Sequence, residues 1–321
     1  MPPGPSLSPP LPSSQPPVPP QPPPPAGGGK PLSVNLRGVL WMLLSALGFA
    51  CMGAVVKLLG GRLDAMQIVF FRAAVGVLAV LPFIARAGWA TAWPRYPGRH
   101  LVRGLTGLAA IVCSFYALTM LPLATVTAIT FAQPLFMIVI AVLFLGETVR
   151  WRRWTATIVG FLGVLVMLRP GAGMVEWAAL AALGNALFVA ASAAQVKAMP
   201  DDDRELTLLL SFQVVSAIAL VGPAWLVWVP PTPAEWLLLG LLGLLGVGSQ
   251  AAVIRAYRVG AEASFVAPFD YVRLPVAAAL GFWIFGEAVD GWTAAGAAII
   301  VASTLYIARR GGRLAAPAPR G

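Results

Sequence analysis

The sequence predicts an all-α integral membrane protein whose ten transmembrane helices form two inverted five-helix repeats. Three observations predict this fold class. The chain is 59% hydrophobic and only 11% charged, whereas a soluble domain carries roughly 25% charged residues. Its apolar residues fall in ten long segments. One stretch that spans a turn and an apolar segment has a weaker copy about 140 residues later, which indicates an internal repeat.

The ten apolar segments are expected to be helices. Most are close to the ~20 residues that a helix needs to cross about 30 Å of hydrocarbon. Backbone groups in lipid must be hydrogen-bonded within the segment, and these segments lack the alternation that is typical of strands. They cover residues 38–59, 65–85, 102–121, 124–145, 153–169, 175–197, 206–228, 234–256, 263–285 and 291–308.

The repeat is visible in residues 116–147 and 257–287, which both close with Gly-Glu. Each Gly should end a helix, and each Glu should sit near the N-terminus of the next helix. Basic residues follow the first copy, but they precede the long apolar segment of the second. Since Lys and Arg stay on the cytoplasmic side of short loops, the copies should cross the membrane in opposite orientations, as in many secondary transporters. The residues are Arg150, Arg152, Arg153, Arg255 and Arg258.

The charge distribution also orients the whole chain. When both termini are cytoplasmic, most of the 22 Lys and Arg residues lie in cytoplasmic loops and tails. Five helices per repeat, an odd number, produce the inversion. We therefore expect a multi-pass protein of the bacterial cytoplasmic (inner) membrane. Its parts are a disordered Pro-rich cytoplasmic tail (1–35), a first repeat (36–170), a second repeat (171–308) and a basic cytoplasmic tail (309–321).

Composition and motifs exclude several function classes. The net charge of +10 is explained by loop charges that set topology and meet anionic lipid headgroups, so no nucleic-acid partner is expected. The sequence contains no Gly-rich nucleotide-binding loop that ends in Lys-Ser/Thr, and no serine- or zinc-hydrolase motif. With one His and two Cys, no metal site, cofactor or enzymatic activity is expected.

Ionisable residues inside the apolar segments are the main candidates for a substrate site, because they are costly there and tend to face a cavity. Asp270 and Arg273 lie in the ninth segment at a spacing that puts them on one helix face. They either neutralise each other as a buried pair or contact the substrate, with Asp270 as a proton carrier, and both can hold at once. Arg72, in the second segment, either contacts substrate or extends to the outer interface.

Proline residues predict interruptions in the fourth and ninth segments. Pro134, Pro268 and Pro275 remove helical hydrogen bonds, and freed carbonyl groups are tolerated only toward protein or a cavity. These two segments are therefore expected to line the centre. Weaker polar candidates, which serve equally well to hold helices together, are Tyr116, Gln133, Asn185, Gln250, Tyr257 and Tyr271.

Three motifs resemble the EamA family of the drug/metabolite transporter superfamily. They are F-F-R in the second segment, F-A-Q-P-L-F…L-F-L-G-E-T-V-R-W-R-R-W-T and the later F-G-E. The resemblance covers about residues 36–308 and implies ten helices, cytoplasmic termini and a central cavity formed mostly by helices three, four, eight and nine. A-P-F-D-Y-V-R-L-P is similar to a subgroup that includes vitamin and S-adenosylmethionine carriers. Arg273-Leu274-Pro275 replaces the usual Glu-Pro, which argues against an amino-acid exporter.

The sequence therefore predicts a secondary transporter, exporter or importer, that moves small organic metabolites by alternating access. A vitamin or S-adenosylmethionine-type uptake carrier of the same superfamily is the alternative. A passive channel, a scaffold or a membrane enzyme has less support, since no reactive cluster or large soluble domain is visible. The expected partners are a small-molecule substrate and the lipid bilayer, and this interpretation is compatible with proton coupling and with a homodimer.

Overall fold

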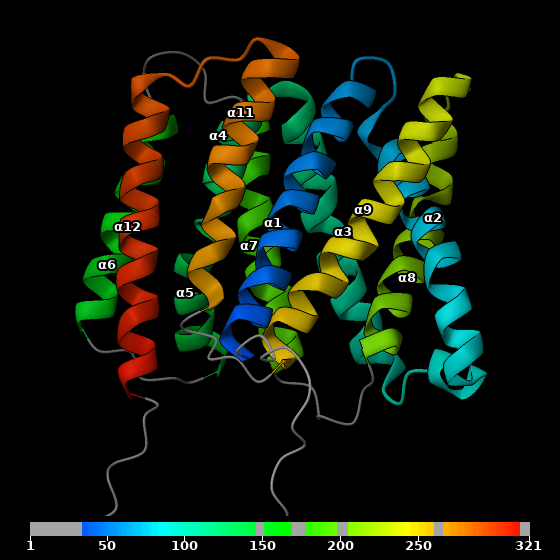
Figure 1. The fold of residues 1–321 in the computed structure, drawn as a ribbon, viewed down its shortest axis with the longest axis horizontal. Coiled ribbons are helices and arrows are strands. Elements are labelled where there is room, and N and C mark those ends of the chain that lie inside the picture. Colours follow the sequence, from blue (N-terminus) through cyan, green and yellow to red (C-terminus); the bar gives the residue numbers. More distant parts are fainter. Residues whose placement is uncertain (1–33, 146–150, 169–176, 198–204, 260–265, 315–321) are drawn as a thin grey trace, which may run out of the picture. The chain divides into compact units, whose positions relative to one another are not determined.

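The structure, a computed structural model, describes residues 34–145, 151–168, 177–197, 205–259 and 266–314. All regular secondary structure in these residues is helical (Figure 1), which confirms the all-α prediction. Several features that the sequence singles out lie outside the described residues. They are the Pro-rich segment 1–33, the first Gly-Glu pair at 146–147, and Arg150.

Seven helical spans in the described residues are long and apolar enough to cross a membrane. Their bounds follow the expected apolar segments closely. Helix α1 covers Val34–Leu59 and α2 covers Ala65–Ala87. Asp64 starts α2, because its carboxylate accepts a hydrogen bond of 2.8 Å from the backbone N–H of Met66. The seven spans are Leu36–Leu59, Ala65–Ala87, Pro97–Met120, Leu123–Ile140, Trp177–Gln195, Glu205–Leu226 and Pro233–Arg258.

Helix α9 starts at a recognisable sequence signal. The start of α9 is a capping box, in which Thr232 and Glu235 satisfy each other's backbone N–H groups, with Pro233 at the first helical position. A short 3₁₀ helix, η1, covers Trp89–Ala92. The remaining bounds are Pro97–Met120 for α3, Trp151–Leu168 for α6, Trp177–Lys197 for α7, Glu205–Leu226 for α8, Pro233–Arg258 for α9 and Gly291–Leu314 for α12.

The fourth and ninth segments are both interrupted, as their prolines predict. The fourth consists of α4, Leu123–Thr130, and α5, Gln133–Leu145. The backbone N–H of Phe131, between them, bonds to carbonyl groups only two and three residues earlier, so the α-helical register is lost there. The ninth consists of a 3₁₀ helix, η2, at Ala267–Val272, followed by α11, Arg273–Phe285.

Helices of the first half of the chain pack mainly against helices of the second half. Helix α1 packs along α9, α3 along α7, α2 along α8 and α6 along α12. In Figure 1, α6 and α12 stand together at the left edge of the view, and α2 and α8 stand together toward the right. The two interrupted segments also meet, because α4 packs against α11. Each half of the chain therefore depends on the other to bury its apolar faces.

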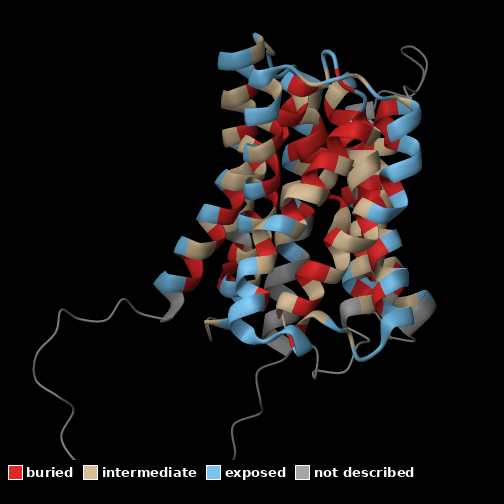
Figure 2. Cartoon of the chain, turned by 90° about the vertical axis from the view of Figure 1, so that its right-hand side faces the viewer, coloured by how far each residue is buried: buried red, intermediate tan, exposed pale blue. Residues whose placement is uncertain are grey.

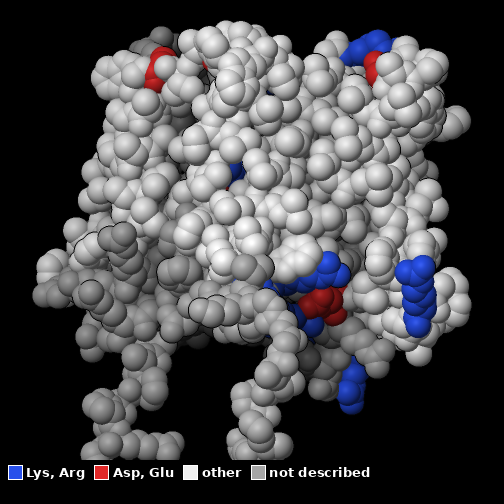
Figure 3. Space-filling model, viewed as in Figure 1, with Lys and Arg blue, Asp and Glu red and all other residues white. Residues whose placement is uncertain are grey.

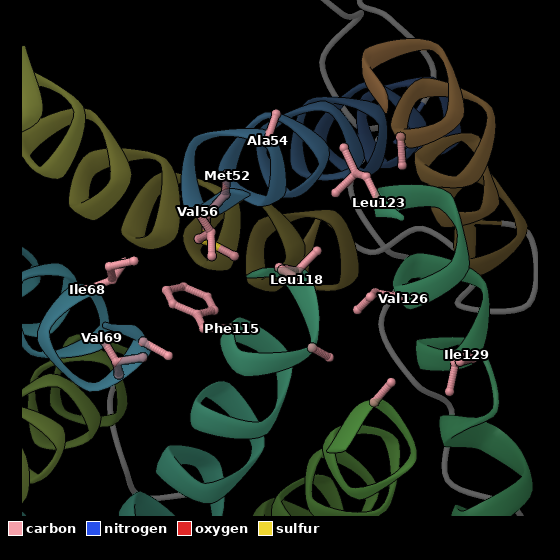
Figure 4. Close-up of a cluster of buried hydrophobic side chains, with 14 of the residues drawn as sticks. Met52, Ala54, Val56, Ile68, Val69, Phe115, Leu118, Leu123, Val126 and Ile129 are labelled. Carbon is pink, nitrogen blue, oxygen red and sulfur yellow. The ribbon is translucent and has the colours of Figure 1, made fainter. Parts of the chain in front are cut away.

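A continuous hydrophobic core joins these helices. Phe115 of α3 is 1% exposed, and Figure 4 shows its ring between side chains of α1 and α2, among them Val56, Ile68 and Val69. The same cluster continues into α4 through Leu118, Leu123, Val126 and Ile129. This packing holds the interrupted fourth segment beside the uninterrupted helices α1 and α3.

The outward faces of the helices are largely apolar. Figure 2 shows buried residues toward the interior and exposed ones on the outer faces of the helices. Large apolar side chains such as Leu143, Trp225 and Trp283 are more than two-thirds exposed, at 70%, 74% and 77%. On the face drawn in Figure 3, Lys, Arg, Asp and Glu gather toward the two ends, and the middle is almost free of them. An apolar belt between charged ends is what a membrane-spanning bundle presents to lipid.

Candidate functional site

The interruptions of the fourth and ninth segments contact each other inside the bundle. The ring of Phe131, between α4 and α5, lies 4.7 Å from the ring of Tyr271 in η2, measured between centroids. Phe131 belongs to the main hydrophobic core, and Tyr271 packs against it. This contact brings the two proline-marked segments together, which is what a site lined by both of them requires.

Asp270 and Arg273 lie one helical turn apart, and their charges act on each other. The guanidinium of Arg273 lies over the ring of Phe49 in α1, 5.0 Å from its centroid. The Nε atom of Arg273 is buried and has no hydrogen-bond partner among the described residues. The carboxylate of Asp270 also acts on Tyr257 of α9. The two charges therefore form an interacting pair, but one donor of Arg273 is left over.

Arg72 lies inside the bundle and does not extend to the outer interface. It is 2% exposed, so the alternative in which its side chain reaches the membrane surface is wrong. Its Nη1 donates a long hydrogen bond of 3.4 Å to Oε1 of Gln213 in α8. The ring of Phe212 lies 6.0 Å away, and on α9 a Cβ atom at Gly246 would lie 2.8 Å from Arg72 Nε. Close packing against a glycine, together with α8, holds this cation away from the surface.

Asn185 and Gln133 lie beside the interruption of the fourth segment. Asn185 of α7 is 5% exposed, and its Nδ2 donates a hydrogen bond of 3.0 Å to Oγ1 of Thr130, the last residue of α4. This bond supports the alternative that Asn185 holds two helices together. Gln133 is the first residue of α5 and is partly buried.

Tyr116 and Gln250 lie on the uninterrupted helices α3 and α9. Tyr116 of α3 is 37% exposed, and its backbone carbonyl accepts a hydrogen bond from the hydroxyl of Thr119. Gln250 lies on α9 and is partly buried. The candidates that the structure brings into contact or electrostatic interaction are therefore those around the ninth segment, with Asn185 and Gln133 next to the fourth.

Sequence reasoning missed a cluster that ties four helix ends together, those of α1, α3, α4 and α11. Lys57, near the end of α1, forms an ion pair with Glu287 and donates a hydrogen bond of 2.7 Å to the carbonyl of Leu121. Glu287 accepts a hydrogen bond of 2.8 Å from the backbone N–H of Leu123, at the start of α4. Gly286 ends α11 in the left-handed region, at φ 67°, as expected of this glycine.

The expectation that Glu287 sits at the start of the following helix is therefore wrong. It satisfies the N-terminus of α4, which lies far away in the sequence, while Asp290 caps α12 through the backbone N–H of Thr293 at 2.8 Å. The sequence signal that points to this cluster is a basic residue near the end of one apolar segment and an acidic residue after another. Only the tertiary packing decides which ends meet.

An apolar groove of about 370 Å³ lies between α4, α11 and α12. Alanine and valine side chains make up much of its wall, and Thr293 is the polar residue that lines it. Leu274 and Pro275, next to Arg273 in the sequence, also line it, but the polar candidates do not. In the described residues, no three His, Cys, Asp or Glu side chains lie close enough together to hold a metal ion. The polar chemistry therefore lies between the helices and not in this groove.

Comparisons with known proteins agree with a membrane carrier. The profile of the EamA-like transporter family matches residues 36–169. An S-adenosylmethionine uptake transporter of Rickettsia prowazekii is 32% identical over 280 residues, which are 86% of this chain and 94% of that protein. A riboflavin transporter of Rhizobium johnstonii is 33% identical over 85% of this chain and 91% of that protein.

Similarity extends to an exporter and to a solved fold. A pseudopaline exporter of Pseudomonas aeruginosa is 30% identical over 85% of this chain and 96% of its own length. A protein crystal structure that is 20% identical in sequence superposes with a TM-score of 0.59, over 87% of this chain and 99% of that one. This likeness concerns the fold alone.

Proposed function

Because this chain belongs to the EamA-like transporter family, we propose that it is a secondary transporter that moves small organic metabolites by alternating access. One structural observation carries the proposal: two interrupted helices meet at Phe131 and Tyr271, and the charged residues Asp270 and Arg273 flank Tyr271. Interrupted helices inside a bundle are where secondary carriers bind their substrates and coupling ions.

We propose further that ten membrane spans form two inverted repeats, residues 36–170 and 171–308. The pairing of the helices supports this arrangement. Helix α1 packs against α9 and α11, and α7, its counterpart in the second half, packs against α3 and α5. Helices α2 and α8, and likewise α6 and α12, occupy equivalent places in the two halves and pack against each other. A pseudo-two-fold axis between two five-helix units produces this pattern.

The inverted arrangement has a direct test in the bacterial cytoplasmic membrane, where we propose that both termini face the cytoplasm. A reporter fused after Arg153 is expected to read cytoplasmic, and one fused after Asp290 is expected to read external, because basic loop residues stay inside. If both fusions report the same side, the inverted repeat is wrong.

Within the site, we assign substrate contact to Asp270, Arg273, Tyr271 and Arg72. The two arginines offer hydrogen-bond donors, and the aromatic ring offers an apolar surface for an organic solute. Asp270 is the proposed proton carrier if transport is coupled to protons. In that case, transport by the Asp270→Asn variant is expected to lose its response to a pH gradient. We also propose, as weaker candidates, that four other residues line the substrate cavity: Tyr116, Gln133, Asn185 and Gln250.

The second candidate is the narrower one, an uptake carrier for S-adenosylmethionine or a vitamin. It is favoured by the similarity to carriers named for S-adenosylmethionine and riboflavin, whereas the similarity to an exporter favours the opposite direction. Purified protein in liposomes, assayed with labelled S-adenosylmethionine and riboflavin with and without a pH gradient, tests both candidates. Flux no greater than in protein-free liposomes for either solute contradicts the uptake-carrier candidate. A homodimer is compatible with all of these proposals.

A further inference from the structure

Four residues from four helices form a polar seam: Ser45, Arg72, Ser249 and Arg273. Each has a buried polar atom without a hydrogen-bond partner among the described residues, namely Oγ of the two serines and Nε of the two arginines. Ser45 is 0% exposed and Ser249 is 4% exposed. Buried polar groups are usually hydrogen-bonded, so four neighbouring residues with unsatisfied polar atoms need a physical explanation.

The members of the seam are linked through the contact between α1 and α9. Arg72 packs against Gly246 of α9, and Ser249 lies one turn further along the same helix. A Cβ atom at Gly48 of α1 would collide with the hydroxyl of Ser249, so these two residues touch. The next residue of α1, Phe49, lies under the guanidinium of Arg273. Ser45 is one turn before Gly48 on α1.

Buried positive charge exceeds buried negative charge along the seam. Asp270 is the described carboxylate that acts on Arg273, and the other described carboxylates have partners elsewhere. Glu205 pairs with Arg258, Glu235 with Arg62 and Glu287 with Lys57, while Asp64 and Asp290 cap their own helices. Among the described residues, Arg273 therefore has one carboxylate that acts on it, whereas the side-chain hydrogen bond of Arg72 goes to a neutral amide, that of Gln213.

We propose that the polar seam binds a carboxylate of the transported solute, so that the protein carries organic acids or zwitterions. This inference rests on the proposed function and narrows it to a chemical class. A buried guanidinium needs an anionic partner, and arginine binds carboxylates through two parallel N–H donors. The serine hydroxyl groups add two neutral donors beside them. A single negative charge balances the excess, which matches a carboxylate better than a doubly charged phosphate.

The inference is tested with matched solutes that differ in the carboxylate. Liposomes that contain the purified full-length protein are loaded with S-adenosylmethionine and decarboxylated S-adenosylmethionine, biotin and biotinamide, pantothenate and panthenol, and riboflavin. Efflux is followed by mass spectrometry against protein-free liposomes. We expect the acid of at least one pair to leave at least about tenfold faster than its partner, because a site built for a polar group rejects the analogue that lacks it.

The outcomes separate the inference from the proposed function. If every transported pair loses acid and partner equally fast, or if riboflavin alone moves, the polar seam does not recognise carboxylates, although the protein is a transporter. If no solute leaves faster than from protein-free liposomes, the proposed transport of such metabolites is contradicted, and the inference falls with it.

Variants of seam residues test whether the preference for the acid depends on the polar seam. Arg72→Gln and the milder Ser249→Ala are expected to lower the ratio of acid efflux to partner efflux. Arg86→Gln is the matched control, because Arg86 is exposed at the end of the same helix, α2, and it should keep the wild-type ratio. A merely structural role for Arg72 would lower the efflux of acid and partner in parallel and leave the ratio unchanged, and that result would overturn the assignment.

Discussion

Charged side chains are fully partnered at one end of the bundle but not in the polar seam. Lys57 pairs with Glu287 and also donates to the carbonyl of Leu121, and the second carboxylate oxygen of Glu287 accepts from the backbone of Leu123. In contrast, the hydrogen bond from Arg72 to Gln213 is long, at 3.4 Å, and Nε of both seam arginines is unused among the described residues.

The difference separates two uses of charge in one fold. A buried or half-buried ion whose donors and acceptors are all satisfied stabilises the contact between the elements that it joins. An ion that is buried more deeply, with donors to spare, costs stability in the empty protein and is retained when it binds something else. We therefore expect changes in the end cluster to affect stability alone, and changes in the seam to affect transport as well as stability.

The largest effect is expected at the interior pair. Asp270→Asn leaves Arg273 without its described carboxylate partner, and Arg273→Gln leaves Asp270 without its cation. The loss of one partner of a buried ion pair can cost roughly 3–5 kcal/mol. We expect each single variant to reduce the amount of folded protein in the membrane and to abolish transport, measured by immunoblot and by flux into liposomes.

The double variant distinguishes a structural pair from a substrate-binding pair. If Asp270 and Arg273 only neutralise each other, Asp270→Asn combined with Arg273→Gln restores both protein and transport. If they bind the solute, the protein returns but transport does not. We expect the second result, because Arg273 keeps a buried, unused donor. A double variant that transports at the wild-type rate would refute the site assignment, with Arg86→Gln as the exposed control.

Much of the fold follows from local sequence signals. The length and apolar character of the segments predict the helices, and Pro134 and Pro275 mark the two segments that are interrupted. Asp270 and Arg273 stand out because a charge at membrane depth is expensive wherever the rest of the chain lies. Signals of this kind depend on the solvent and on near neighbours, so they can be recognised before any packing is known.

The contacts between distant residues could not be predicted in this way. Leu123 and Glu287 are 164 positions apart, and the choice of which helix Glu287 caps depends on how α4 and α11 pack. Ser45 and Ser249 are ordinary residues in apolar segments, and only the α1–α9 contact brings them into one seam. The burial of Arg72 likewise depends on Gly246, a residue with no polar signal of its own.

An intermediate effect is expected for the end cluster. The side chains of Lys57 and Glu287 are each 16% exposed, so Lys57→Gln or Glu287→Gln leaves one half-buried charge without its partner. We expect each variant to lower the free energy of unfolding by about 1–3 kcal/mol. The double variant should lose less than the sum, because the two residues share one interaction. These free energies are measured by thermal or denaturant-induced unfolding of each variant in detergent.

The transport rates of the end-cluster variants should differ from those of the seam variants. Per folded molecule, the end-cluster variants should transport at close to the wild-type rate, because their charges are already satisfied within the protein. If Lys57→Gln stops transport while its unfolding free energy is unchanged, the cluster takes part in the transport cycle, and the division between stabilising and transporting charges fails at this end.

The smallest effect is expected for the exposed ion pair between Arg62 and Glu235. Arg62 donates to Glu235 and to the carbonyl of Pro230, but its side chain is 43% exposed, and exposed ion pairs contribute little because water and salt screen them. We expect Arg62→Gln to shift the melting temperature less than Lys57→Gln does. Glu235→Ala should cost more than Arg62→Gln, because alanine has no side-chain acceptor to complete the capping box with Thr232.

The contribution of Arg62 should also be independent of pH over the ordinary range. The hydrogen bond with Glu235, with burial acting in the opposite direction, raises the pKa of Arg62 above its usual value. A raised pKa in the folded state adds stability that is fully present below the unfolded pKa and is lost only as the pH rises through the folded one. For an arginine both values lie far above neutrality, so the difference in melting temperature between wild type and Arg62→Gln should be the same at about pH 6 and about pH 8. A difference that grows between these two conditions would mean that Arg62 is coupled to another titrating group and is not an isolated surface partner of Glu235.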